Sequence, residues 1–235
     1  FVAFIGSQVD GHDFIPKAIS RGASAVMAST SWDGCEDWDA SIPLIMTEDP
    51  VKSLADLATA HRKLFKIPLI AITGTNGKTS TKNLLTHILS KRFSVLSTDG
   101  NFNNHIGLPL TLLKLNKSHE MAVIEMGASQ KGDIRYLCNI ALPDQGTITN
   151  ISLAHTEFFN DIETIQATKG ELFQYLGANG GRAFVNLDDE RVAELGQGCT
   201  NHVPYSFKKE TERSFTMTGP DKTGCYDLQF RKYSA

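Results

Sequence analysis

The chain has 235 residues, 41% of them hydrophobic and 21% charged, which is typical of a globular protein with one large or two modest domains. A formal net charge of -3 without a dense lysine or arginine run argues against nucleic-acid binding, and no apolar run approaches the ~18 residues that cross a bilayer. The four cysteines are irregularly spaced without a C-x-x-C pair, which argues against a disulfide framework or a zinc site and favours a reducing cytoplasm.

Residues 1–66 are predicted to form a small α/β domain. Three strand-like runs occupy residues 1–5, 25–28 and 42–46. A helix is expected over residues 14–21, where apolar residues recur at helical spacing until Gly22 ends the helix. His12 lies in the turn before this helix; it either caps the helix or contacts a ligand, and capping is the favoured interpretation.

A second helix is predicted to begin at Asp49 and Pro50, because aspartate is a good N-cap and proline suits the first helical position. Its apolar face is expected to consist of Leu54, Leu57, Ala58, His61 and Leu64. Residues 66–68 are Lys-Ile-Pro and end this helix. We therefore place a domain boundary after residue 66 and assign residues 67–235 to a second domain.

Residues 70–81 carry the most informative pattern of the chain, Ile-Ala-Ile-Thr-Gly-Thr-Asn-Gly-Lys-Thr-Ser-Thr. This order predicts a strand, a phosphate-binding loop and a helix, in which backbone N–H groups, the Lys78 charge and the Thr79 hydroxyl bind phosphates and their Mg2+. The loop, residues 73–79, is a variant, because it lacks the first glycine of the usual P-loop pattern. A plain glycine turn is the alternative, but turn chemistry does not explain the Lys-Thr pair that follows Gly77.

The rest of the second domain repeats the strand and helix alternation. Further strands are predicted at residues 93–96, 121–125, 145–149 and 182–186, and helices at 78–89, 133–141 and 162–176. The apolar face of the first of these helices is expected to comprise Leu84, Leu85, Ile88 and Leu89. Such alternation predicts a doubly wound, mostly parallel sheet with its ligand beyond the carboxyl ends of the strands. Residues 203–235 are expected to form short antiparallel strands of unassigned role.

Several polar residues follow predicted strands and so converge on one edge of this sheet. Glu125 either holds Mg2+ beside the P-loop or caps a turn, and the metal role is favoured. Asn150 and His155 follow the next strand, where a lone loop histidine is more often structural. Lys169 lies in a predicted helix, and its position alone indicates a solvated surface lysine.

A second cluster of glycine and asparagine, residues 99–109, follows another strand end. Its Asn103, Asn104 and His105 supply hydrogen-bond donors where a substrate could meet the nucleotide. A polar turn without a ligand is an equal alternative on these residues alone.

Residues 73–79 are similar to the ATP loop shared by the Mur ligases of peptidoglycan synthesis and folylpolyglutamate synthase. Further segments resemble the Mur ligases, most closely the member that adds D-Ala-D-Ala to UDP-N-acetylmuramoyl-tripeptide. These segments are residues 100–109, 123–128, 154–159 and 168–173. Residues 1–14 resemble the UDP-substrate-binding N-terminal domain of the family. The resemblance extends to about residue 189.

This resemblance implies the roles of individual residues. The ATP-binding residues would be Gly74, Thr75, Asn76, Gly77, Lys78, Thr79 and Ser80. Two Mg2+ ions would be held by Thr79, Glu125, His155 and Lys169, with Lys169 carried as a carbamate, which gives magnesium the oxygen anion that it prefers. Lys78, His155 and Lys169 would be the catalytic residues. Substrate contacts would come from Asn103, Asn104, His105 and Asn150.

The reaction implied is ATP-dependent amide formation through an acyl phosphate, with UDP-N-acetylmuramoyl-tripeptide and D-Ala-D-Ala as substrates and ADP and phosphate as products. The resemblance also implies a cytoplasmic monomer and a C-terminal ligase domain that this chain lacks, and the N-terminal domain is expected to begin before Phe1. We therefore expect this polypeptide alone to lack ligase activity. The family usually carries glycine where this chain has Ser152 and Asn160, so we expect unusual backbone angles there.

Two alternatives remain at this point. The nearest alternative is another ligase of the same group, MurE or folylpolyglutamate synthase. Asn103 and Asn104 favour the D-Ala-D-Ala ligase, because MurE has a Thr-Thr-Pro pattern at these positions. A non-catalytic nucleotide-binding module is the other, and it would not require Glu125, His155 and Lys169 together.

Overall fold

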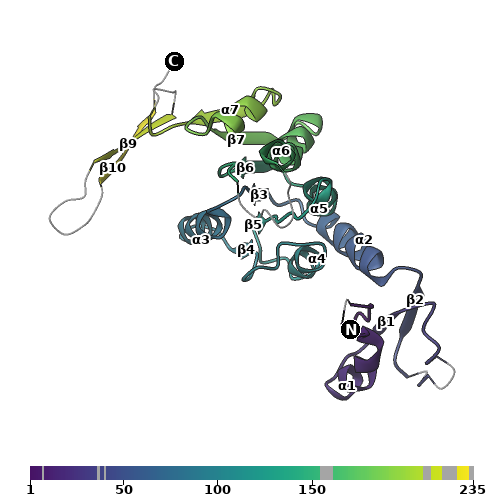
Figure 1. Ribbon diagram of the computed structural model, residues 1–235. Helices are drawn as coiled ribbons and strands as arrows, with labels where there is room; N and C mark the ends of the chain where they lie inside the picture. Colours follow the sequence, from purple (N-terminus) through teal and green to yellow (C-terminus); the bar gives the residue numbers. More distant parts are fainter. Residues whose placement is uncertain are drawn as a thin grey trace.

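The computed structural model describes residues 1–6, 8–35, 38–39, 41–153 and 161–208, together with the backbone of two strands at 213–218 and 227–232. A small N-terminal unit and a larger α/β unit lie side by side, and a two-stranded hairpin extends from the opposite end of the larger unit (Figure 1). Within the described part of the chain, no helix is both long and apolar enough to cross a membrane.

The larger unit is built on a six-stranded sheet with the order β4-β5-β3-β6-β7-β8, in which every neighbouring pair is parallel. Its strands are β3 (Leu69–Thr73), β4 (Val95–Ser97), β5 (Met121–Glu125), β6 (Gln145–Ile148), β7 (Arg182–Asn186) and β8 (His202–Tyr205). The chain enters at the central strand β3, adds strands first on one side and then on the other, and so confirms the predicted doubly wound sheet.

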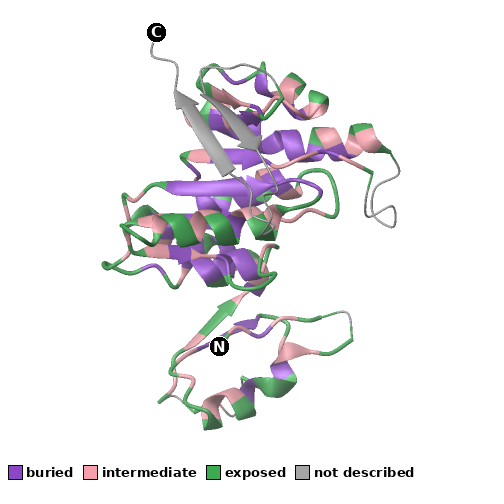
Figure 2. Cartoon of the chain, turned by 90° about the vertical axis from the view of Figure 1, so that its left-hand side faces the viewer, coloured by how far each residue is buried: buried purple, intermediate pink, exposed green. Residues whose placement is uncertain are grey.

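Helices cover both faces of this sheet (Figure 1). They are α2 (Pro50–Lys63), α3 (Lys78–Leu89), α4 (Gly107–Leu112), α5 (Asp133–Ala141), α6 (Ile162–Ala178) and α7 (Glu190–Gly196). Helix α3 packs against Ile70, Ile72 and Val123 on one face, whereas α4, α5 and α6 share the main core on the other. Strand β3 is buried along its whole length, as a strand covered on both faces must be. Figure 2 shows buried strands, in purple, at the centre of the larger unit.

The N-terminal unit contains a 3-10 turn (Gly11–Phe14), α1 (Ile15–Ser20), β1 (Val26–Ser29) and β2 (Leu44–Thr47), and its two strands pair in parallel. The expected strand at residues 1–5 is not continuous, because only Val2 and Ile5 form isolated bridges. Gly22 has a positive φ of 92° just after α1, as predicted for the helix end.

His12 has a structural role in the N-terminal unit. Its Nε2 accepts the N–H of Ser29 at 3.0 Å, and its Nδ1 hydrogen-bonds the Asp10 carboxylate. The ring is buried and stacks on Trp32. The prediction that His12 caps the helix is wrong, because Asp10 caps the 3-10 turn and α1 has no side-chain cap. Both ring nitrogens of His12 nevertheless have protein partners, which favours a structural role over a ligand contact.

Helix α2 begins as predicted, with the Asp49 carboxylate accepting the N–H groups of Val51 and Lys52. Its predicted apolar face is wrong in part, since Leu57 and Leu64 are 48% and 75% exposed. The buried face includes Arg62 instead, because α2 packs against α4 and α5 and this guanidinium meets backbone carbonyls at the end of α5.

The boundary at residue 66 stays a prediction, but the packing of α2 bears on it. Ala55 and Ala58 belong to the core of the larger unit, whereas the core of the smaller unit contains Ala3, Ile15, Val26 and Ala28. The packing therefore favours a boundary before Pro50.

Three further differences concern the larger unit. On α3, Leu84 and Ile88 are exposed while Leu85 and Leu89 pack inward, so only half of its predicted apolar face is correct. Helix α4 occupies part of the expected loop at residues 99–109. Strand β8 pairs in parallel with β7, whereas antiparallel strands were expected; that expectation holds for β9 (Arg213–Thr218) and β10 (Asp227–Lys232).

Candidate functional site

The site is organised by the loop between β3 and α3, at the point where the strand order reverses. Gly74 and Gly77 have φ angles of 139° and 78°, which side chains with a Cβ rarely adopt. A Cβ on Gly74 would also collide with the Thr149 hydroxyl. These two glycines are therefore required by the loop geometry, and the loop delivers Lys78 to the first turn of α3.

Residues after β6 hold this loop in place. The Asn150 side chain pairs with the backbone of Asn76, accepting its N–H at 3.1 Å and donating to its carbonyl at 3.0 Å. Thr149 donates to the same carbonyl at 2.7 Å, and Thr75 donates its hydroxyl to the Ser152 carbonyl at 3.2 Å. Asn150, predicted to contact substrate, thus lies against the P-loop and shapes its backbone.

Ser152 does not have the unusual backbone expected of a glycine replacement. Among the described residues, Leu142 is the one non-glycine with a positive φ, so Ser152 has an ordinary φ. Its hydroxyl accepts a hydrogen bond from the Asn76 amide at 3.2 Å, which a glycine could not do. Asn160 lies outside the described residues, as does His155.

Lys78 folds back onto its own loop. Its Nζ donates to the carbonyls of Gly74 and Thr75, both at 2.9 Å. Burial lowers the pKa of Lys78, and the nearby Glu125 carboxylate opposes that effect. The ammonium is thereby held at the mouth of the loop, within reach of an anion that the loop binds.

Glu125 is buried at the end of β5, with only 2% of its surface exposed. Its two carboxylate oxygens accept hydrogen bonds from the Thr79 hydroxyl at 2.9 Å and from the Asn103 amide at 2.8 Å. The structure thus brings together Thr79 and Glu125, the pair predicted to share a metal. Within the described part of the chain, no three His, Cys, Asp or Glu side chains gather closely enough to hold a metal ion by themselves.

Lys169 projects from α6 and is 4% exposed, so its first interpretation as a solvated surface lysine is wrong. Burial, reinforced by the positive charge of Lys78, lowers the pKa of Lys169 from 10.5 to about 8, while Asp133 and Glu171 act in the opposite direction. Near pH 7 the amine is therefore still mostly protonated, with about one tenth of it neutral.

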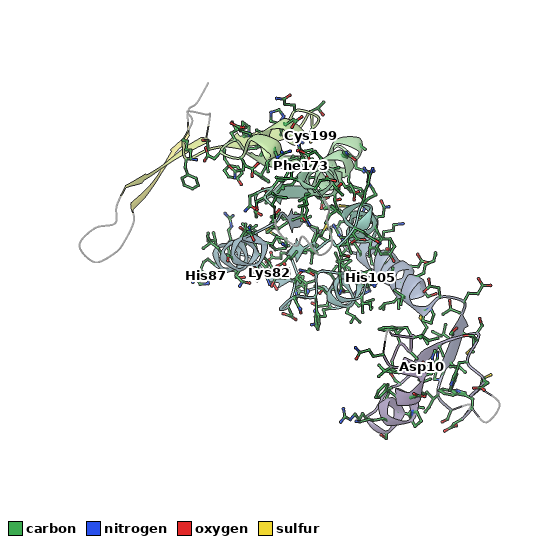
Figure 3. All side chains as sticks on the ribbon, in the orientation of Figure 1. Asp10, Lys82, His87, His105, Phe173 and Cys199 are labelled. Carbon is green, nitrogen blue, oxygen red and sulfur yellow. The ribbon has the colours of Figure 1, made fainter. Side chains whose placement is uncertain are left out.

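A cleft of about 360 Å³ has both Lys78 and Lys169 in its walls. Its walls are formed by Gly74, Thr75, Lys78, Asn103, Asn104, His105, Gly127, Ala128, Ser129, Asp133, Tyr136, Leu137, Ile165 and Lys169. The Asn104 side chain also accepts the N–H of Gly107, the first residue of α4, at 2.8 Å. The neighbouring His105 is exposed (Figure 3). The walls do not include six of the other predicted residues: Asn76, Gly77, Thr79, Ser80, Glu125 and Asn150.

Glu171 is an anchoring residue to which the sequence motifs assigned no role. Its buried carboxylate accepts the N–H groups of Gly132 at 2.7 Å and Arg135 at 2.9 Å, at the first turn of α5. An acidic partner is favoured there by the helix dipole. Its position two residues after Lys169 was visible in the sequence, but only the packing of α6 on α5 reveals the contact.

Comparisons with known proteins agree with this geometry. The sequence profile of the Mur ligase middle domain matches residues 72–230. The UDP-N-acetylmuramoyl-tripeptide--D-alanyl-D-alanine ligase of Bacillus subtilis (strain 168) is 35% identical over an alignment of 241 residues, gaps included. The alignment covers 95% of this chain and 50% of that protein.

Two solved structures are also similar to this chain. MurF from Thermotoga maritima in complex with ADP aligns with a TM-score of 0.83 at 33% identity, over 99% of this chain and 52% of that one. MurF from Acinetobacter baumannii aligns with a TM-score of 0.81 at 28% identity, over 100% of this chain and 52% of that one. The chain thus spans about half the length of the relatives it matches.

Proposed function

This chain belongs to the Mur ligase family, and from that membership we propose that the protein is an ATP-dependent ligase that joins D-Ala-D-Ala to UDP-N-acetylmuramoyl-tripeptide in the bacterial cytoplasm, acting as a monomer. The observation that carries the proposal is one cleft that contains both the P-loop Lys78 and the buried Lys169. The relatives matched favour this reaction over that of MurE, folylpolyglutamate synthase or a non-catalytic module.

The nucleotide phosphates would bind at residues 74–80. Helix α3 begins at Lys78, and the N–H groups of a first helical turn have no intrahelical acceptor, which is the arrangement that stabilises phosphate oxygens. Lys78 would exchange its two carbonyl partners for a phosphate oxygen, a stronger, charge-assisted hydrogen bond. The brace formed by Asn150 would keep the loop backbone in this shape without touching the nucleotide.

The donor set beside the loop fits Mg2+. Glu125 and Thr79 offer a carboxylate and a hydroxyl oxygen that already meet at 2.9 Å, and magnesium prefers such hard oxygen ligands. His155 and Lys169 would complete a second magnesium site. Bound Mg2+ supplies neutralisation of the negative charge that builds up on the transferred phosphoryl group.

Lys169 is suited to carry a carbamate. Its neutral amine can attack the carbon of CO2 and release one proton, which leaves an N-carboxylate in place of an ammonium. The lowered pKa of Lys169, about 8, supports this step because only the neutral amine reacts. The product would turn a positive charge into an oxygen ligand next to the P-loop.

The remaining wall of the cleft would receive the substrates. A carboxylate oxygen of the tripeptide attacks the γ-phosphorus of ATP and displaces ADP, giving an acyl phosphate. The amine of D-Ala-D-Ala then attacks the acyl carbon, an amide forms and phosphate leaves. Asn103, Asn104 and His105 lie where they could orient the acceptor, and Asn103 also holds Glu125.

The proposal is tested by phosphate release in the full-length protein, assayed with either the tripeptide or the dipeptide nucleotide and with D-Ala-D-Ala. We expect release only when the tripeptide nucleotide and D-Ala-D-Ala are both present. We also expect Lys169→Ala to reduce turnover at least ~100-fold, a loss that is typical for a group acting in phosphoryl transfer. Equal turnover with the dipeptide nucleotide, or unchanged turnover in Lys169→Ala, would refute the proposal.

A further inference from the structure

Lys82 is a buried lysine that the proposed reaction does not use. It projects from α3 one turn after Lys78, and only 3% of its surface is exposed (Figure 3). Its Nζ donates to the backbone carbonyl of Thr98 at 2.6 Å, at the end of β4. Among the described residues, that carbonyl is the hydrogen-bond acceptor of this ammonium.

Stability alone does not account for a charge at this position. An ammonium has three donors and loses its hydration on burial, and one neutral carbonyl together with the charge of the nearby, exposed Asp99 compensates only part of that loss. A methionine has a similar length and would fill the same space without the desolvation penalty. The charge at Lys82 is therefore better explained by the hydrogen bond that holds Thr98 in place than by a contribution of the lysine to the stability of the core.

Thr98, whose carbonyl accepts the hydrogen bond from Lys82, also contacts Glu125; we call this contact of Lys82, Thr98 and Glu125 the junction. The Thr98 hydroxyl accepts the backbone N–H of Glu125 at 3.0 Å, and the Thr98 N–H donates to the Val123 carbonyl at 3.2 Å. The loop that begins at Thr98 returns through Asn103, whose amide donates to the Glu125 carboxylate. Glu125 is thus fixed at both its backbone and its carboxylate by the segment that Lys82 anchors.

Lys82 also belongs to the same helix as the other oxygen donor. Thr79 precedes it by three residues, a spacing that places both side chains on neighbouring positions of one helix face. The bond from Lys82 to Thr98 therefore joins α3, which carries Thr79, to the strand end that supports Glu125. The Thr79 hydroxyl and the Glu125 carboxylate meet across this junction.

We propose that Lys82 is a positioning residue that sets the separation of Thr79 and Glu125 and thereby the affinity of the nucleotide site for Mg2+. This inference rests on the proposed function, because it assumes that these two oxygens share a magnesium ion. A lysine that only filled the core would affect stability and leave the dependence on magnesium unchanged.

The test compares Lys82→Met with the matched control Lys114→Met. Lys114 is an exposed lysine that pairs with Asp99 at the start of the same loop, with 52% of its side chain exposed. ADP affinity is measured by titration calorimetry with Mg2+ and with EDTA, and the unfolding midpoint is measured for each variant. In Lys82→Met we expect the ADP affinity measured in EDTA to be the same as in the parent. The increase in ADP affinity on adding Mg2+ should be at least tenfold smaller than in the parent, and the thermal unfolding midpoint should be no more than about 5 °C lower. Lys114→Met should behave as the parent.

A Lys82→Met protein with the full Mg2+-dependent gain would overturn the inference. If that variant does not fold, Thr98→Val decides, because it removes the hydroxyl that holds the Glu125 N–H and leaves Lys82 intact. The same loss of the Mg2+-dependent gain in Thr98→Val supports the positioning role, and an undiminished gain overturns it. A parent protein that binds ADP no more tightly with Mg2+ than with EDTA would instead refute the magnesium site of the proposed function and, with it, this role for Lys82.

Discussion

Replacing Lys169 with methionine should make the protein more stable at neutral pH. The side chain is buried, and its pKa falls from 10.5 to about 8, because the folded protein disfavours the charged form. At ~1.36 kcal/mol per pH unit, the folded state bears a penalty of about 3 kcal/mol for keeping this lysine charged. Methionine fills a similar volume and carries no charge, so Lys169→Met removes that penalty.

The sign of the pH dependence follows from proton binding. Below pH 8 both the folded and the unfolded chain bind the proton, and the full penalty is present. Between about pH 8 and 10.5 the unfolded chain still binds the proton while the folded chain has released it, so the stability of the parent rises with pH. The advantage of Lys169→Met should therefore be about 3 kcal/mol at pH 7 and shrink toward zero near pH 10.5.

The assay is urea unfolding of the parent and of Lys169→Met from pH 7 to 10, at fixed ionic strength in CO2-free buffers with EDTA, which exclude carbamate and metal. In thermal unfolding at pH 7, the same gain of about 3 kcal/mol corresponds to a melting temperature higher by roughly 6–12 °C for a chain of this size. Lys114→Met serves as the control, because its exposed ammonium should give a difference that does not vary with pH in this way. A Lys169→Met protein that is less stable at pH 7, or a difference independent of pH, would refute the reasoning.

Two further substitutions test the framework around the site. Gly74→Ala should abolish measurable ADP binding in calorimetry and lower the free energy of unfolding in urea by about 2–3 kcal/mol, because the φ of Gly74 is 139° and the new Cβ would collide with the Thr149 hydroxyl. Gly77→Ala should lower it by only about 1 kcal/mol, because Gly77 has a φ of 78° and open space around its Cβ position. Equal losses in the two variants would contradict this account. Arg62→Met should lower the free energy of unfolding by about 3 kcal/mol, because it leaves backbone carbonyls at the ends of α2 and α5 without their donor. The control Lys63→Met, at an exposed neighbour, should change the free energy of unfolding by less than ~0.5 kcal/mol. Similar effects of the two substitutions would be incompatible with a buried guanidinium that holds these carbonyls.

Much of the fold was predictable because local signals and the global fold agree. The P-loop at residues 73–79 was recognisable from glycine spacing and the Lys-Thr pair, since few backbones other than a phosphate loop need that order. The strands around it were recognisable as short apolar runs, as expected for strands buried on both faces. Asp49 and Pro50 likewise predicted the start of α2 within a residue.

Several of the errors lie where a helix face was assigned from apolar spacing alone. Leu57, Leu64, Leu84 and Ile88 were expected inside and are exposed. Spacing specifies a stripe only when one side of the helix is packed, but the neighbours that cover a helix come from distant parts of the chain. Arg62 is buried for that reason, since two of its carbonyl acceptors, those of Ala141 and Leu142, lie 79 and 80 residues away at the end of α5.

The sequence by itself thus determined the phosphate loop, the parallel sheet and the order in which polar residues reach its edge, because these depend on short-range chemistry. Only the tertiary structure decided the ionisation of Lys169, the pairing of Thr79 with Glu125, the brace from Asn150 and the junction at Lys82. Desolvation and hydrogen-bond partners depend on which segments pack together. A lysine in a helix is the same in sequence whether it faces water or a carbonyl, and its chemistry follows from the packing around it.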